Sequence, residues 1–298
     1  MLGSDLLAIL SAICIATSGM LVSELNGRVD IVRFARWNMI AAMLMTGAGS
    51  LILGGWRTIE GWQLGLLAGS SFAGIIIAST TYFSAIYMAG PRMTALLFSL
   101  ASPFAVALGY FVLGETISMR QGLGIAIILT GIVLAVGAAR GRREPTADAT
   151  KPPRQFWIGI ALGVITALGQ AAGGLLARPA MAAGVEPFTA MAIRSGIAAV
   201  FYIALGLSPI AWAKQPYRFK WRDLSVGVGA SFFGTGLGMT LLMAALADGD
   251  VGIVSTLSSM TPIAILPMVW IRTRTAPRPL AWIGAGLAVV GTALLSIP

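Results

Sequence analysis

Apolar residues occur along this chain in runs of about twenty, and short stretches between the runs hold most of the charged side chains. A helix of that length crosses a bilayer core of roughly 30 Å, because each residue adds about 1.5 Å. Ten runs are present, at about residues 6–22, 34–53, 62–87, 93–113, 121–139, 156–176, 188–207, 224–246, 251–271 and 280–297. The pattern therefore predicts an all-α, polytopic membrane protein with ten transmembrane helices.

The fourth and ninth runs share a pattern of hydroxyl residues followed by proline. Ser99 and Ser102 precede Pro103, and Ser258 precedes Pro262 at the matching place half a chain later. Proline inside a helix removes a backbone hydrogen bond and clashes with the preceding turn. We therefore expect both helices to be interrupted at these prolines, which are the predicted break or gating positions.

Further matches in the same order extend the repeat over both halves of the chain. They are Gly124 and Gly131 with Gly284 and Gly291, Ser71–Gly74 with Ser231–Gly234, and Arg36 with Arg194. Because each half has five helices, an odd number, the halves must enter the membrane from opposite sides. The sequence thus predicts two inverted five-helix repeats, an arrangement that places substrate sites near the midplane where interrupted helices meet.

A basic, proline-containing segment separates the two halves. We assign residues 1–139 to the first repeat, 140–155 to the linker and 156–298 to the second repeat. Of the 20 Lys and Arg residues, 16 lie in the odd-numbered loops or at the helix ends beside them, and three lie near the even-numbered loops. By the positive-inside rule, this distribution places the odd-numbered loops in the cytoplasm and both termini outside.

Composition narrows the classes of function. The chain is 57% hydrophobic and 10% charged, and its net charge of +9 comes from short clusters between apolar runs, which argues against a nucleic-acid partner. It has one cysteine and no histidine, and its eleven acidic residues fall in loops or at helix ends. We therefore expect no metal, no cofactor, no enzymatic activity and no proton relay of buried carboxylates.

The run from Pro103 through Gly114 and Glu115 to Gly124 resembles the drug/metabolite transporter superfamily, specifically its ten-helix EamA-type exporters. An arginine that opens the second helix, and again the seventh, adds to the likeness. The second unit departs from the pattern, because Thr273 and an arginine stand where the first has Gly114 and Glu115. The resemblance implies export of small metabolites, often amino acids, through a central cavity lined by both halves.

Hydroxyl groups beside the two prolines are the main candidates for substrate binding. Residues three or four apart share a helix face, and carbonyls freed by proline can bind ligands together with hydroxyls. The alternative is that small residues only allow close packing and that their hydroxyls bond back to their own helix. The candidates of this kind are Ser99, Ser102, Ser258, Ser259 and Thr261, and Ser255 lies on the same helix face as Ser258 and Ser259.

Four other side chains are candidates for the same cavity. Ser79 and Tyr82 lie three residues apart on the third helix, where the ring could form an aromatic wall or anchor the helix at the interface. Asn38 and Gln170 are amides well inside apolar runs, so they either brace helices or face water. Arg194 is ionisable within a span, and it could contact substrate, orient the helix or snorkel to the interface.

Three functions from different classes remain open. The favoured one is an amino-acid or related metabolite exporter that works by alternating access, as a monomer among lipids, in the bacterial inner membrane. A multidrug exporter of organic cations is the closest rival among transporters. A membrane enzyme lacks histidine and an acidic cluster, and a scaffold would not explain matching prolines.

Overall fold

The computed structural model describes residues 2–25, 28–57, 59–89, 94, 97–98, 100–138, 153–207, 220–273 and 279–296, and their regular structure is helical. Two shorter apolar helices, Ala101–Leu113 and Pro279–Gly291, accompany five helices that are long and apolar enough to cross a membrane. Those five are Gly3–Val22, Gly61–Tyr82, Arg154–Ala182, Pro187–Leu207 and Trp221–Asp248.

In the first half, several of the five helices are built from joined segments. The elements in order are α1 (Leu2–Leu25), α2 (Ile31–Leu53), the 3₁₀ turn η1 (Gly55–Arg57), α3 (Gly61–Ser71), η2 (Phe72–Ile77), α4 (Ala78–Ala89), α6 (Ala101–Leu108), η3 (Gly109–Leu113) and α7 (Met119–Ala138). Segments η2 and η3 are π-helical, so α3–η2–α4 is one helix and α6–η3 ends another.

The second half repeats this order. Its elements are α8 (Pro153–Ala182), α9 (Pro187–Leu207), α10 (Trp221–Ser231), the π-helical η6 (Phe232–Gly238), α11 (Met239–Asp248), α12 (Val251–Ser258), α13 (Thr261–Thr273) and α14 (Pro279–Ser296). Segments α10–η6–α11 form one helix, and α12 with α13 forms another. Over the described residues the joined elements make five helices in each half.

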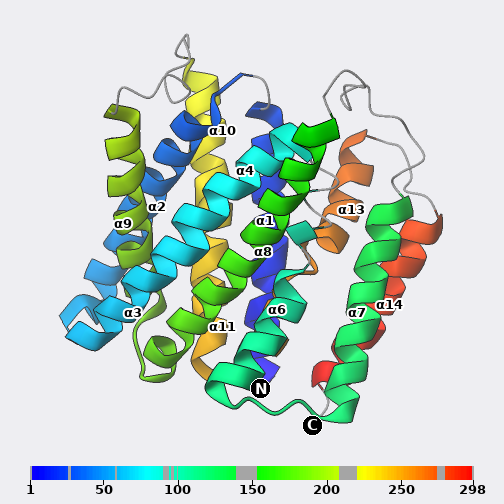
Figure 1. The fold of residues 1–298 in the computed structure, drawn as a ribbon. Helices are drawn as coiled ribbons and strands as arrows, with labels where there is room; N and C mark the ends of the chain where they lie inside the picture. The colour runs from blue at the N-terminus through cyan, green and yellow to red at the C-terminus, as the bar shows by residue number, and fades with distance from the viewer. Residues whose placement is uncertain are drawn as a thin grey trace.

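The two halves run through the structure in opposite directions. In Figure 1, α1 rises from the N-terminus at the lower edge, whereas α8, the first helix of the second half, descends from the upper edge. The C-terminus returns to the lower edge. The predicted fold, two inverted five-helix repeats, is therefore confirmed.

Glycines end helices at three connections. Gly54, Gly114 and Gly184 have φ angles of 74°, 68° and 88°, a left-handed conformation that costs glycine little because it has no Cβ. At the opposite end of α2, the Asp30 side chain accepts hydrogen bonds from the backbone N–H groups of Val32 and Arg33. These local signals fix where the chain turns back.

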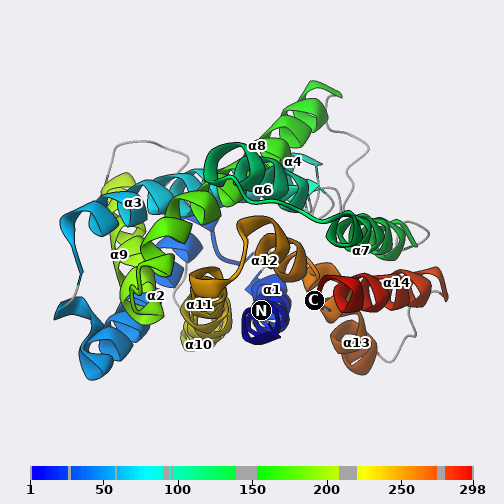
Figure 2. The same cartoon turned by 90° about the horizontal axis from the view of Figure 1, so that it is seen from below.

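The glycines that first indicated the repeat pack α7 against α14. A Cβ at Gly131 would lie 2.5 Å from the Gly284 carbonyl oxygen, and one at Gly291 would lie 2.7 Å from the Gly124 carbonyl oxygen. The symmetric contact brings the fifth helices of the two repeats together at one side of the bundle, as Figure 2 shows. These positions are small because two backbones meet there.

The matched Ser–Phe–X–Gly sequences lead into the two π-helical segments that begin at Phe72 and Phe232. At each segment, the first helix of the opposite repeat packs closely. A Cβ at Gly74 in η2 would lie 3.0 Å from the Cα of Gly173 in α8, and one at Gly234 in η6 would lie 2.5 Å from the Ser18 hydroxyl in α1. Short π segments occur often at functional sites. We therefore expect a functional site near these two helix crossings.

Candidate functional site

Both proline-containing helices are interrupted close to their prolines. In the second repeat, the chain turns at Ser259 and Met260 between α12 and α13. In the first, it turns at Leu100, and α6 begins at the next residue. Pro103 and Pro262 therefore lie in the first turn of the helix that follows each break rather than in a helix interior. Proline is tolerated there because the first-turn N–H groups have no intrahelical partner.

Hydroxyls at the second break bond to their own helix. Ser258 and Ser259 donate to the carbonyl of Ser255 over 3.0 and 2.7 Å, and Thr261 donates to the carbonyl of Ser258 over 3.0 Å. The Ser255 carbonyl also accepts from the N–H of Ser259, whereas the Ser258 carbonyl has Thr261 as its donor because Pro262, four residues on, has no N–H. In this conformation the three side chains stabilise the break.

The first break is joined to the second repeat by a hydroxyl pair. Ser102 is fully buried, and its hydroxyl hydrogen-bonds the hydroxyl of Thr256, so α6 and α12 lie side by side. A Cβ at Gly252 would also lie 2.9 Å from the Val106 side chain on α6. Ser99 lies outside the described residues.

Gln170 lies near the middle of α8 on the face directed at these interrupted helices. On that face, a Cβ at Gly163 would lie 2.6 Å from Leu97, and one at Gly174 would lie 3.9 Å from Val251 at the start of α12. Gln170 is seven residues after Gly163 and four before Gly174, which places all three on one side of the helix. Its half-buried amide makes no hydrogen bond to the rest of the chain where the structure describes it.

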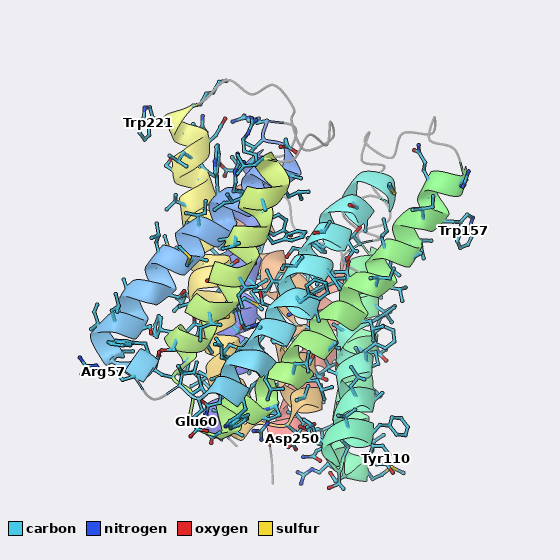
Figure 3. All side chains as sticks on the ribbon, turned by 60° about the vertical axis from the view of Figure 1, so that its left-hand side comes forward. Arg57, Glu60, Tyr110, Trp157, Trp221 and Asp250 are labelled. Atoms are coloured by element: carbon cyan, nitrogen blue, oxygen red, sulfur yellow. The ribbon has the colours of Figure 1, made fainter. Side chains whose placement is uncertain are left out.

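Ser255 faces Gln170 from α12. The two helices run in opposite directions, with Trp157 of α8 near the upper end and Asp250, just before α12, at the lower end of Figure 3. One turn above the contact between Gly174 and Val251, they therefore present Gln170 and Ser255 to each other. The half-buried Ser255 hydroxyl likewise lacks a hydrogen-bond partner within the described ranges. The sequence placed Ser255 on one helix face with Ser258 and Ser259, but only antiparallel packing pairs it with Gln170.

The remaining candidates make contacts between helices. The Asn38 carbonyl oxygen accepts a 2.7 Å hydrogen bond from Thr235, which braces α2 against η6. Ser79 and its neighbour Thr80 lie within hydrogen-bonding range of the Tyr202 hydroxyl on α9. Tyr82 instead packs edge-on against Phe98, with 5.7 Å between ring centroids. The Tyr82 ring thus contacts Phe98, whereas Ser79 lies beside Tyr202.

Arg194 on α9 is 1% exposed. Its Nη1 lies 3.4 Å from the Met191 sulfur and 3.1 Å from the Met243 sulfur, and its Nε has no hydrogen-bond partner among the described residues. A Cβ at Gly74 would lie 3.1 Å from its Nη2. The guanidinium thus lies against η2 in the bundle interior instead of extending toward the membrane surface.

Glu115 connects the first repeat to the start of α12. Its Oε1 accepts a 2.9 Å hydrogen bond from the N–H of Val251, and the N–H of Gly252 also donates to the carboxylate. A Cβ at Gly109 would collide with Oε2, so glycine at that position allows the carboxylate to fold back. Burial raises the pKa of Glu115, and nearby Asp250 adds to the rise, whereas the two N–H donors and Arg178 lower it. The sequence indicated the Gly–Glu pattern, but the contact is set by tertiary structure.

An apolar cavity of about 430 Å³ lies between α6–η3 and α7. Its lining contains none of the predicted site residues: Val106, Ala107, Tyr110, Ile117, Gly122 and Ile125. Tyr110 is 58% exposed, which places this cavity at the outer surface of the bundle. The predicted central cavity lined by both halves stays a prediction.

Comparison with known proteins agrees with this architecture. The sequence pattern of the EamA-like transporter family matches residues 2–137 and 157–297. The chain belongs to the EamA-like transporter family. The predicted resemblance to the drug/metabolite transporter superfamily is therefore confirmed, and the protein is a multi-pass membrane transporter.

Solved structures show the same fold as this EamA-like transporter. One, titled "Crystal structure of protein", superimposes with a TM-score of 0.79 over 98% of this chain and 96% of its own, at 17% sequence identity. At that identity the likeness is one of fold alone. No protein with a curated description matches the chain.

Proposed function

We propose that this EamA-like transporter exports small metabolites, foremost amino acids, across the bacterial inner membrane by alternating access between its two repeats. The observation that carries the proposal is the facing pair of Gln170 and Ser255. Both are polar side chains without partners in the described part of the chain, and the packing of α12 on α8 directs them toward each other near the middle of α8. Polar groups without partners inside a membrane protein indicate a substrate path.

The chemistry of the pair fits an amino acid. An amide offers two N–H donors and a carbonyl acceptor, and a hydroxyl offers one donor and two acceptor sites. Such groups can accept hydrogen bonds from the ammonium of an amino acid and donate others to polar atoms of the same solute. The inverted repeat adds a route, since rocking one unit against the other exposes a midplane site to each side in turn. A binding position shared by the two units needs no second chain, which favours a functional monomer.

Transport by purified protein in liposomes tests this proposal. We expect counterflow of neutral amino acids and none of quaternary ammonium compounds. Replacing Gln170→Leu should raise KM for the amino acid about 10- to 100-fold, because hydrogen bonds to charged groups contribute about 1.5–3 kcal/mol. Ser255→Ala should act in the same direction.

The matched control is Ser195→Ala. Ser195 is fully buried, but its hydroxyl donates to the carbonyl of Met191 in its own helix over 2.6 Å, so its loss should leave KM unchanged. Transport of quaternary ammonium compounds in place of amino acids would identify a cation exporter instead. Equal KM values for Gln170→Leu and the unaltered protein would remove Gln170 from the site.

A further inference from the structure

Within the described part of the chain, the guanidinium of Arg194 is a buried charge without a counter-ion. Its side chain is 1% exposed, and the nearest polar contacts of Nη1 are two thioether sulfurs, which are weak hydrogen-bond acceptors. Its Nε is buried without a partner, and no acidic side chain of the described residues pairs with it. Removing a cation from water without an anion is costly, so such a residue calls for a functional explanation.

Interfacial anchoring does not explain this side chain. Arg194 lies seven residues after Pro187, the first residue of α9, which is about 10 Å along the helix axis. A snorkelling arginine extends its guanidinium to the membrane surface, whereas this guanidinium is enclosed by Met191, Met243 and Gly74. Its repeat counterpart Arg36 near the start of α2 is only half-buried and lies against Gly206 of α9.

The position of the guanidinium is fixed beside the proposed substrate site. Ser71 donates a 2.6 Å hydrogen bond to the Arg194 carbonyl, which attaches this part of α9 to the third helix. A Cβ at Gly74 would contact both the guanidinium and Gly173 of α8. Gly173 is three residues after Gln170, so the charge lies within about one helical turn of the Gln170–Ser255 pair.

We propose that Arg194 recognises the anionic group of the transported solute, and that this group is a carboxylate. The inference rests on the proposed transport function and assigns its substrate class. One guanidinium matches one carboxylate in charge and in its two-donor geometry. Gln170 and Ser255 then remain for the rest of the solute. In the conformation described, the guanidinium is closed off from water.

The variant Arg194→Met tests the inference. Methionine has a similar length, and Met191 and Met243 already surround the position, so the variant should fold; apolar replacement of buried charge is often neutral or stabilising. The assay is competition by L-phenylalanine and by L-phenylalaninamide, which lacks the carboxylate, against transport in liposomes. For the unaltered protein we expect the acid to compete 10- to 100-fold better than the amide. In Arg194→Met the two should compete equally, and Arg194→Lys should give an intermediate ratio.

Arg36→Met is the matched control and should keep the full preference for the acid. A merely structural role for Arg194 would change the amount of active protein but not the ratio of acid to amide. Retention of the acid preference by Arg194→Met would overturn the inference while leaving the proposed function intact.

A second measurement separates failure of the inference from failure of the proposed function. The melting temperature of purified protein in detergent is titrated with sodium propionate, a carboxylate without an amine. Stabilisation of the unaltered protein but not of Arg194→Met supports the anion site even if no amino acid is transported. Equal responses of the two proteins, or none in the unaltered protein, overturn it.

Discussion

Removal of the Glu115 carboxylate should weaken the joint between the two repeats in a way that depends on pH. The carboxylate receives the N–H groups of Val251 and Gly252, the first two residues of α12, which have no partners inside that helix. Glu115→Ala removes the carboxylate that accepts from both of these N–H groups. At about 1 kcal/mol for each lost hydrogen bond, we expect a loss of about 2 kcal/mol, roughly a 30-fold change in an equilibrium constant.

Glu115→Gln should behave differently because it keeps a carbonyl acceptor and loses only the charge. Burial is the largest influence on Glu115 and raises its pKa, so the folded protein binds a proton here more readily than the unfolded chain. Stability from this group is therefore fully present below the ordinary carboxyl pKa of 4.5 and is lost as pH rises through the raised pKa. The glutamine variant should match or exceed the unaltered protein near pH 7 and lack this pH dependence.

Apparent melting temperatures in detergent between about pH 4.5 and 7.5 measure these effects. The difference between Glu115→Gln and the unaltered protein should shrink as pH falls. Gly109→Ala, whose new Cβ would displace Oε2, should resemble Glu115→Ala, and the double variant should be less destabilised than the sum of the two. The reasoning is refuted if Glu115→Ala is as stable as the unaltered protein, or if the glutamine variant keeps the full pH dependence.

Two further predictions concern packing and topology. Gly173→Ala would place a Cβ 2.6 Å from the Gly74 Cα and should destabilise the fold by about 1–3 kcal/mol. Gly65→Ala, with no neighbour within 4 Å of the new Cβ, should be neutral or stabilise the fold by up to about 1 kcal/mol. Thermal unfolding of the two variants measures the difference. In a Cys14→Ala background, cysteines replacing Glu60 and Arg222 should react with impermeant thiol reagents from opposite sides of the membrane, Arg222→Cys from the cytoplasmic side. Labelling of both from one side would contradict the inverted topology.

Several features of the candidate site followed from local sequence. Pro103 and Pro262 predicted interruptions, and both helices are interrupted close by, because proline restricts backbone geometry wherever the helix packs. The pattern did not reveal whether the neighbouring hydroxyls were available to a ligand. Ser258 and Thr261 bond to carbonyls of their own helix, and that outcome depends on where the turn falls relative to the proline.

Other site features depended on the neighbour across the interface. Gln170 appeared in the sequence as one of two amides in apolar runs, with bracing and solvent-facing roles both open. Its place opposite Ser255 requires the antiparallel packing of α8 on α12. Asn38, the other amide, contacts Thr235 and braces two helices. Two side-chain amides in similar apolar runs therefore have different neighbours because of how their helices pack.

The sequence by itself determined the ten membrane-spanning helices, their division into two repeats and the opposite insertion of those repeats. These features follow from local properties of the chain: the length of the apolar runs, the positions of glycine and proline, and the odd number of helices in each half. Each apolar run must cross the bilayer, so an odd number of crossings reverses the direction in which the second repeat is inserted. Tertiary structure alone decided that Glu115 meets the first turn of α12 and that Arg194 lies buried with no counter-ion among the residues the structure describes. Both are relations between helices more than 40 residues apart in the chain, and no local pattern specifies which side chains two packed helices bring together.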